Sequence, residues 1–382
     1  MTFYTGRPNI PDIDEYLSKA KKILESKRLT NHGACVKELE SRLSLQLGVK
    51  HVVTVCNATI GLMVTLKLLG LTGEVILPSF TFIASAHVLE WEEIKPVFCD
   101  INPLTHNIDD TKIESLITNR TSAIMGVHIW GRPCPHEELS AIASKHGLRL
   151  FYDAAHAFGT TYKLRPIAAL EEISVLSFHA TKVFNTFEGG AIVTNDDELA
   201  RKARLITNYS FEGEDNVTGL GINAKMTEIH AVMGLCCLDS HQLVLDHNEK
   251  VYSRYKEALA DIKGISLIEY PENEHSNFHY VVIEIDEAVF GKSRNEVHRN
   301  LKTNGVMARR YFYPGCHNSE PYRTLYPRAS LPHTDELCKK VLALPGGSGI
   351  DSLEQVDKIV SCLIAKKCTI KIDADTQRLF SQ

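Results

Sequence analysis

Short runs rich in Val and Ile alternate along the chain with segments of helical patterning. The runs predict strands at residues 51–55, 74–77, 96–98, 123–128, 148–152, 173–178 and 191–194. Apolar residues at helical spacing predict helices between them, at residues 60–69, 85–91, 111–117 and 137–146. Strands and helices that alternate in this way form a largely parallel sheet covered on both faces. The pattern therefore predicts an α/β fold that binds ligands beyond the carboxyl ends of its strands.

The same pattern divides the chain into three parts. Residues 1–30 are expected to form an N-terminal arm and a helix at residues 13–24. Residues 31–245 are expected to form a large domain that opens with a second helix through Leu45 and closes with a long helical pattern at residues 226–245. Residues 246–382 are expected to form a smaller α/β domain, with strands at residues 279–285 and 306–311 and helices at residues 294–304 and 353–365.

The composition indicates a globular protein that binds neither nucleic acid nor membranes. Hydrophobic residues make up 44% of the chain, and the net charge is −5, whereas binding to phosphate backbones favours a basic surface. No basic region followed by an apolar stretch opens the sequence, so we expect no secretory signal and a cytoplasmic location. The ten cysteines, Cys368 among them, lack the spacing of zinc or redox sites and are expected to be mostly buried. The histidines lack metal-ligand spacing, so no metal is expected.

The first candidate for chemistry is Lys182, which comes shortly after the predicted strand at residues 173–178. Hydroxyl side chains precede it and the pair Gly189-Gly190 follows it, a setting in which a lysine can form a Schiff base with an aldehyde. Asp153 ends another apolar run, where a carboxylate is costly unless a cation or several donors meet it. Taken alone, Asp153 is more simply a cap or an ion-pair partner. A pyridoxal phosphate enzyme needs both groups, a lysine for the aldehyde and a carboxylate that keeps the ring nitrogen protonated.

Other strand ends offer further partners for such a cofactor. Asn57-Ala58-Thr59 lies between a strand and a helix, where free amides and the helix dipole favour a phosphate, although an ordinary N-capped turn is equally consistent with it. Ser177 is a further hydroxyl donor. Phe80 and Phe82 are both candidates to stack on the ring, although aromatics in such positions more often pack in a core. His156 is a candidate to contact the ring or to support the carboxylate. Neither the Walker phosphate loop nor the dinucleotide-binding glycine motif is present.

These segments together resemble the DegT/DnrJ/EryC1/StrS family, the vitamin B6-dependent sugar aminotransferases with the aspartate aminotransferase-like fold (fold type I). The resemblance covers nearly the whole chain. It rests on Arg28-Leu29-Thr30-Asn31-His32-Gly33, Phe151-Tyr152-Asp153-Ala154-Ala155-His156-Ala157-Phe158-Gly159, Ser177-Phe178-His179-Ala180-Thr181-Lys182 and Arg310-Tyr311-Phe312-Tyr313-Pro314. It implies a large domain with a mostly parallel seven-stranded sheet and a smaller C-terminal α/β domain.

The resemblance also implies roles for individual residues. Lys182 would hold pyridoxal 5'-phosphate as a Schiff base and later serve as the general base and acid, Asp153 would pair with the ring nitrogen, and Phe82 would stack on the ring beside His156. The remaining cofactor contacts are to the phosphate, from Asn57, Ala58, Thr59 and Ser177 of the same chain and from Asn208 of a neighbouring subunit. A homodimer with shared active sites is therefore implied.

Substrate contacts follow from the same resemblance. They are expected from His32, from Lys225 in the segment at residues 221–226, and from Arg310 and Tyr311. Phe187 stands where many relatives carry glycine.

Within the family, the sequence is most similar to enzymes that aminate carbon 4 of dTDP-4-keto-6-deoxy-D-glucose. This implies L-glutamate as the amino donor and an amino sugar destined for surface polysaccharide such as O-antigen, or for a glycosylated metabolite. A 3-aminotransferase acting on a dTDP-3-keto-6-deoxyhexose and a non-catalytic relative that binds the cofactor stay open as alternatives. A sugar dehydratase on the same fold carries histidine at the lysine position, so Lys182 argues against it.

Overall fold

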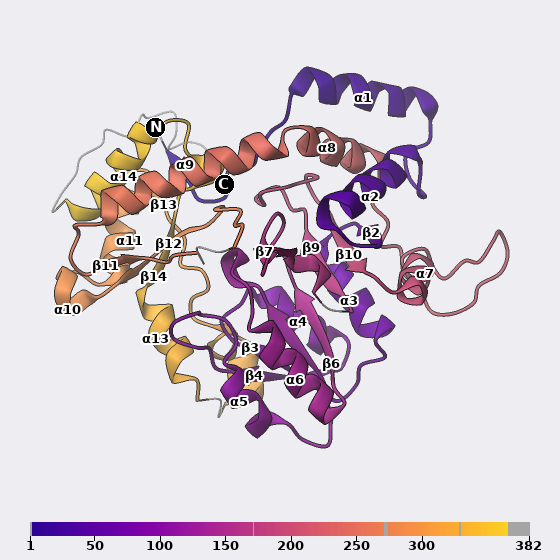
Figure 1. Cartoon of the computed structure of the whole chain (residues 1–382), viewed down its shortest axis with the longest axis horizontal. Coiled ribbons are helices and arrows are strands. Elements are labelled where there is room, and N and C mark those ends of the chain that lie inside the picture. Colours follow the sequence, from indigo (N-terminus) through magenta and orange to yellow (C-terminus); the bar gives the residue numbers. More distant parts are fainter. Residues whose placement is uncertain (1, 171, 271–273, 328–329, 366–382) are drawn as a thin grey trace.

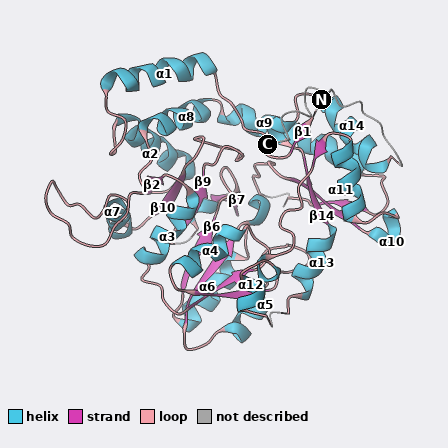
Figure 2. Ribbon diagram, turned by 180° about the vertical axis from the view of Figure 1, so that it is seen from behind, coloured by secondary structure: helices cyan, strands magenta, loops and turns pink. Residues whose placement is uncertain are grey.

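A computed structural model describes residues 2–170, 172–270, 274–327 and 330–365. Two units share the chain (Figure 1): a larger unit built on a central sheet, and a smaller unit built on a second sheet. Helix α1 (Ile13–Ser26) lies outside α8 (Glu228–Asp239), and α9 (His241–Leu259) runs from there to the smaller unit (Figures 1 and 2). No helix within the described residues is long and apolar enough to cross a bilayer.

The larger sheet has seven strands among the described residues, in the order β2-β10-β9-β6-β5-β3-β4. Strand β10 is antiparallel to both of its neighbours, and the other strands run parallel to one another. The sequence predicted this sheet correctly. The strands are β2 (His51–Val55), β3 (Glu74–Pro78), β4 (Lys95–Cys99), β5 (Thr121–Val127), β6 (Arg149–Asp153), β9 (Ser174–Ser177) and β10 (Gly190–Thr194).

Successive residues of a strand point to opposite sides of a sheet. In this sheet both sides carry apolar side chains, which are buried under helices. Val52 packs among residues of α2, α6 and α8, whereas the adjacent Val53 packs among residues of α3, α4 and α7. Burial on both faces explains why the strands read as continuous apolar runs. The covering helices are α2 (Ala34–Leu47), α3 (Ala58–Leu68), α4 (Ile83–Trp91), α6 (His136–His146), α7 (Asp197–Ile206) and α8.

The smaller unit is an antiparallel sheet of β11 (Ile265–Leu267), β12 (Val281–Ile285) and β14 (Val341–Leu344), packed against helices. The start of the chain joins it, because β1 (Phe3–Tyr4) pairs with β13 (Val306–Met307). The helices of this part are α9, α10 (Glu287–Phe290), α11 (Arg294–Thr303), α13 (Pro332–Lys340) and α14 (Leu353–Ile364), whereas α12 (Tyr322–Leu325) packs on the larger sheet through Tyr322. The short elements α5 (Asp110–Ile113), β7 (Thr161–Tyr162) and β8 (Arg165–Pro166) complete the larger unit.

Three expected elements differ from the structure. The helical pattern at residues 226–245 forms two helices, α8 and α9, which are separated at Ser240. The helix expected at residues 111–117 is α5 followed by a 3-10 turn. The strand expected at residues 306–311 ends at Met307, because the chain then turns so that Tyr311 lines a cavity. The division of the chain near residue 245 stays a prediction and falls within α9.

The expected burial of the cysteines is confirmed where the structure describes them. Cys35 and Cys56 are half-buried, and the other seven described cysteines are buried. Cys368, like the rest of residues 366–382, lies outside the described residues.

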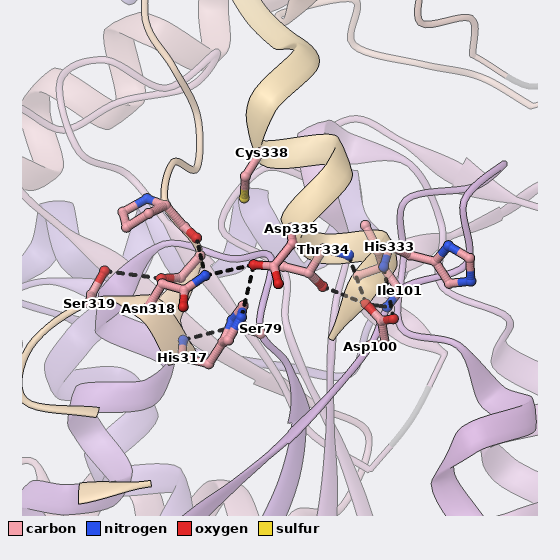
Figure 3. Close-up of polar contacts among 12 residues, drawn as sticks. Ser79, Asp100, Ile101, His317, Asn318, Ser319, His333, Thr334, Asp335 and Cys338 are labelled. Atoms are coloured by element: carbon pink, nitrogen blue, oxygen red, sulfur yellow. Dashed lines mark hydrogen bonds and ion pairs between the residues drawn. The ribbon is translucent and has the colours of Figure 1, made fainter. Parts of the chain in front are cut away.

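A polar network, which we call the clamp (Ser79, Asp100, His317, Thr334 and Asp335), joins the ends of β3 and β4 to His317 and to the first turn of α13 (Figure 3). The Ser79 hydroxyl donates to His317 Nδ1 at 2.6 Å, and His317 Nε2 donates to Asp335 at 3.1 Å. Asp100 accepts the Thr334 amide and hydroxyl, both at 2.8 Å, and so caps the start of α13. The clamp therefore fixes residues 308–319 against the edge of the larger sheet.

Candidate active site

A cavity of about 440 Å³ opens beyond the carboxyl ends of the larger sheet's strands. Strands β2, β6 and β9 each contribute the residues that follow them, and the smaller unit closes the other side with Tyr280, Tyr311 and Phe312. Eight residues predicted to bind a cofactor line this one cavity: Asn57, Ala58, Thr59, Phe82, Asp153, His156, Ser177 and Lys182.

Lys182 lies in the loop that follows β9, and its side chain is half-buried. Removing its amine from water lowers the pKa to about 8, and the opposing effect of the Asp153 charge only partly offsets this. The amine donates a hydrogen bond to the Tyr280 hydroxyl at 3.3 Å. A lysine with this pKa is partly neutral near physiological pH, which an amine needs in order to attack a carbonyl or to accept a proton.

Asp153 is a buried carboxylate at the end of β6. One oxygen accepts the Ser85 hydroxyl at 2.7 Å, and the other accepts the Ala155 amide at 3.1 Å. Burial raises the pKa of Asp153, although these hydrogen bonds and the Lys182 charge oppose the rise. The donors hold the carboxylate facing the cavity without neutralising it, so a cationic ligand group beside it would stabilise its charged form.

His156 is a buried histidine whose tautomer follows from its contacts. Its Nδ1 accepts the Trp130 amide at 3.1 Å, so in the neutral ring the proton belongs on Nε2. Burial lowers its pKa well below the ordinary value, which keeps the ring neutral. The ring packs between Tyr280 and Phe312, with centroid separations of 4.6 and 5.9 Å. His156 is thus a fixed, neutral donor in the cavity wall.

The opposite end of the cavity suits an anion. The Asn57 side chain caps α3 by accepting the Ile60 amide at 2.9 Å, and the amides of Ala58 and Thr59 in the first turn have no carbonyl one turn earlier. Gly190 lets this turn lie close to β10, since a Cβ there would come within 2.8 Å of the Ala58 nitrogen. Free amides at a helix N-terminus bind phosphate groups.

These features fit pyridoxal phosphate. The cavity combines a lysine of lowered pKa, a buried carboxylate held by the Ser85 hydroxyl and the Ala155 amide, and an anion site at the start of α3. The expected stacking of Phe82 stays a prediction; the side chain begins α4 and is 56% exposed.

A second cavity of about 520 Å³ adjoins the first and shares Phe82, Tyr311 and Phe312 with it. Arg310, one of the predicted substrate contacts, lines this second cavity, and Tyr311 lines both. Arg309 and Lys302 add positive charge to its wall. An aromatic and basic cavity of this kind suits a phosphorylated, ring-bearing ligand.

Three predicted residues lie outside both cavities. Lys225 donates to the Asn208 side chain at 2.6 Å, and its amine also lies over the Tyr209 ring, 4.9 Å from the centroid. His32 lies 3.8 Å from the buried carboxylate of Glu40. The structure therefore brings Asn208 and Lys225 together but does not place either of them, or His32, in the cavity of the same chain.

Sequence reasoning missed Tyr280, His279 and Ser85. Ser85 supports Asp153 from the first turn of α4, and His279 Nε2 donates to the Thr181 carbonyl at 2.8 Å beside Lys182. Tyr280 lies inside a predicted strand at residues 279–285. The apolar pattern of that strand gives no sign that it meets a lysine almost a hundred positions earlier.

Phe187 adopts a left-handed backbone conformation with φ of 63°. Glycine enters this region without steric cost, whereas other residues rarely adopt it.

Comparisons with known proteins show which proteins the chain resembles. Residues 12–364 match the DegT/DnrJ/EryC1/StrS aminotransferase family. The chain is similar to the dTDP-4-amino-4,6-dideoxy-D-glucose transaminases of Shigella dysenteriae, with 38% identity over 94% of this chain and 98% of the relative, and of Escherichia coli, with 37% identity over 96% and 99%.

Solved structures show the same fold. A crystal structure of DesI in the presence of its TDP-sugar product superimposes with a TM-score of 0.91 and 44% identity, covering 95% of this chain and 92% of DesI. Helicobacter pylori PseC, an aminotransferase of pseudaminic acid biosynthesis, superimposes with a TM-score of 0.88 and 27% identity, covering 95% and 98%. The predicted fold class is confirmed.

Proposed function

The chain belongs to the DegT/DnrJ/EryC1/StrS aminotransferase family, and on this premise we propose that it transfers an amino group from L-glutamate to carbon 4 of dTDP-4-keto-6-deoxy-D-glucose. The products are dTDP-4-amino-4,6-dideoxy-D-glucose and 2-oxoglutarate. As a member of this family, the chain is a pyridoxal phosphate-dependent sugar aminotransferase. The carbon-4 substrate is supported by the two relatives named as transaminases of that sugar.

The observation that carries the proposal is the pairing of Lys182 and Asp153 in one cavity. When bound, the cofactor supplies an aldehyde carbon that carries the amino group and a ring that accepts electrons. Asp153 holds a buried negative charge against which a ring nitrogen keeps its proton. Lys182 takes up and returns protons at Nζ, because its lowered pKa leaves part of the amine neutral.

The other residues bind and orient. The amides of Ala58 and Thr59, with Asn57 and Ser177, hold the phosphate at the start of α3. His156 offers its Nε2 proton to an oxygen of the ring. Arg310 and Tyr311 contact the nucleotide-sugar from the second cavity.

The decisive experiment is NMR of the product formed from dTDP-4-keto-6-deoxy-D-glucose and L-glutamate, with 2-oxoglutarate quantified in parallel. We expect an amine at carbon 4 and one 2-oxoglutarate for each amino sugar. An amine at carbon 3, or product only after a ketoisomerase is added, would replace the carbon-4 assignment. The Lys182→Ala variant serves as the blank.

We further propose that two chains share their active sites as a homodimer. The loop between α7 and α8 projects from the body of the chain (Figures 1 and 2) and carries Asn208 and Lys225 outside their own cavity. Large apolar side chains are exposed on α1 and on this loop: Ile13, Leu17, Leu24, Tyr209, Phe211, Val217, Leu220 and Ile222. Exposed apolar side chains on projecting segments support an interface with another chain.

A complementation experiment tests the shared site. Lys182→Ala and Asn208→Asp chains should each be nearly inactive as homodimers, because one lacks the amine and the other repels the phosphate. Co-expression should restore activity, since one site of the mixed dimer then combines an intact Lys182 with an intact Asn208 from the other chain. Mixed dimers without activity would assign Asn208 to the site of its own chain. Sedimentation velocity gives the oligomeric state independently.

The place of the enzyme in the cell is also a proposal. We place the reaction in the cytoplasm and its product in the supply of amino sugar for surface polysaccharide. A relative in Bacillus subtilis named as a spore coat polysaccharide biosynthesis protein, 32% identical over 87% of this chain, supports the second part.

A further inference from the structure

Tyr280 reaches the cofactor cavity from the smaller unit, immediately before β12. Its hydroxyl accepts a hydrogen bond from the Lys182 amine at 3.3 Å. Among the residues that the structure describes, it is the one group hydrogen-bonded to that amine. The lysine of the larger unit is thus held by a side chain of the smaller one.

The position of the Tyr280 ring is fixed on several sides. The ring packs against His156 at 4.6 Å and edge-on against His279 at 4.9 Å, measured between centroids. Its carbonyl accepts the Tyr270 hydroxyl at 2.9 Å. With 8% of the residue exposed, the hydroxyl has little freedom to leave the amine.

Two neighbouring contacts fix the backbone on either side of Lys182. His279, adjacent to Tyr280, donates to the Thr181 carbonyl at 2.8 Å. Asn9 of the N-terminal arm donates to the Val183 carbonyl at 3.0 Å. The backbone from which the lysine side chain extends is therefore fixed relative to Tyr280.

The charges around the amine decide what this contact does. Burial raises the pKa of Tyr280 well above its ordinary value, so the phenol stays neutral while the amine titrates. A neutral hydroxyl accepts from an ammonium and donates to a neutral amine. The first bond is charge-assisted and stronger, so the contact favours the protonated amine. The other titratable groups that line this cavity or pack on the lysine loop are His128, Asp153, His156, His179, Glu188, His279, Arg309 and Tyr311.

We propose that Tyr280 is a positioning residue for Lys182, whose hydroxyl holds the lysine amine in place, in both protonation states, whenever that amine is not bonded to the cofactor. The inference rests on the proposed function, because a free lysine amine matters only if it moves protons during amino transfer. Tyr280 thereby adds a hydroxyl of the smaller unit to the active-site residues of the larger unit.

Tyr280→Phe tests this inference by removing the hydroxyl and keeping the ring. In the cofactor-free protein, the pKa of Lys182 is measured by competitive acetylation across pH, with the labelled peptide quantified by mass spectrometry. We expect the pKa to fall by about one unit, because the ammonium loses its acceptor. In the loaded enzyme, kcat should fall about 3- to 10-fold with the KM for glutamate within about twofold, and the acid limb of the kcat profile should move to lower pH.

Tyr255→Phe is the matched control. It removes another buried tyrosine hydroxyl of the same unit, one that donates to the Pro345 carbonyl at 2.9 Å and lines neither cavity. If the two variants share the same Lys182 pKa and the same kcat, Tyr280 has no positioning role and the inference is wrong.

A second measurement keeps the test open should Tyr280→Phe fold poorly. In the wild-type protein labelled with ¹³C at the tyrosine Cζ, the Tyr280 resonance should shift with an inflection near pH 8, the pKa of its partner amine. The inflection should vanish in Lys182→Ala. A flat titration in the wild type would overturn the inference.

These outcomes separate the inference from the proposed function. A wild-type enzyme that transaminates, together with an unchanged Lys182 pKa in Tyr280→Phe, refutes the inference alone. A wild-type enzyme that makes no amino sugar, together with the expected pKa shift, refutes the proposed function alone.

Discussion

The two walls of the cofactor cavity are built in different ways. On one wall, Asp153, Lys182 and Asn57 each follow a strand of the larger sheet, and parallel strands bring their carboxyl ends to one edge by topology alone. On the other wall, Tyr280, Tyr311 and Phe312 belong to the smaller unit and to an irregular segment. Backbone pairing positions the first set, whereas the second set depends on side-chain contacts together with the isolated backbone bridge between Arg309 and Ala343.

The clamp shows what the second wall depends on. Residues 308–319 follow the short strand β13, so His317, Ser79 and Asp335 hold this segment in place of a longer ladder. Each partner comes from a different part of the chain. Mutations in the strand-end wall should therefore change mainly kcat. Mutations in the clamped wall should change mainly the free energy of unfolding and the KM for the substrate.

The largest expected effect is at the strand-end wall. Lys182→Ala should lower kcat at least about 10²- to 10⁴-fold, because the general base and acid is lost together with the bond to the cofactor. The purified variant should also lack the absorbance of the lysine-bound cofactor. The exposed Lys256→Ala, whose amine pairs with Glu269, is the control and should keep both. Retention of turnover by Lys182→Ala would refute the central assignment.

Substitutions of two aspartates at strand ends, Asp153 and Asp100, compare the two walls directly. Asp153→Asn keeps the size of the side chain but removes the charge beside the ring, so kcat should fall about 10²- to 10³-fold with little change in stability. Asp100→Asn, at the end of β4 and in the clamp, should instead lower the free energy of unfolding by about 1–3 kcal/mol and leave kcat nearly intact. Urea denaturation and steady-state kinetics on both variants check this. If the two variants behave alike, the contrast between the walls is false.

The third prediction concerns pH and stability. Burial lowers the pKa of Lys182 from 10.5 to about 8, so below pH 8 the folded state bears the full cost of a buried charge. Between pH 8 and 10.5 the folded chain has released the proton and the unfolded chain still holds it, so stability rises with pH. In the cofactor-free protein, Lys182→Met should raise the free energy of unfolding at pH 7 on the order of 1–3 kcal/mol, a range discounted because water enters the cavity.

The gain from Lys182→Met should shrink steadily across the window from pH 8 to 10.5. Urea denaturation at several pH values measures it, with Lys256→Met as the control. A gain that stays constant with pH would mean that the amine is not desolvated in the folded state.

The smallest effect is expected at the clamp. His317→Ala leaves the buried Ser79 hydroxyl without its acceptor and Asp335 without one donor, which should cost about 1–3 kcal/mol of stability. The KM for the sugar nucleotide should rise several-fold, because Tyr311 and Phe312 lose their support. His333→Ala is the control, since His333 joins the network through its backbone amide. An unchanged KM would mean that the clamp does not hold Tyr311 and Phe312 in place for substrate binding.

Sequence reasoning succeeded where local pattern and topology suffice. Apolar runs predict the seven strands, and the ends of parallel strands must converge. The pattern therefore also predicts the grouping of the strand-end residues, Lys182 and Asp153 among them. The same reasoning could not find Tyr280, because its contact with Lys182 depends on how the smaller unit packs on the larger one. It also extended the strand that begins at residue 306 too far, because β-branched and aromatic residues favour a strand there. In the structure the strand ends at Met307, and the clamp holds the chain in another course.

The pairing of β1 with β13 has a consequence for biosynthesis. Phe3 leaves the ribosome long before Val306, its partner in the ladder, which is made only after the whole larger sheet. Asn9 can bind the lysine loop as soon as Val183 has emerged, so the arm attaches to the larger unit well before it attaches to the smaller one. A nascent chain that stops short of Val306 therefore contains every group of the strand-end wall and none of residues 308–319. The enzyme completes its active site late in translation.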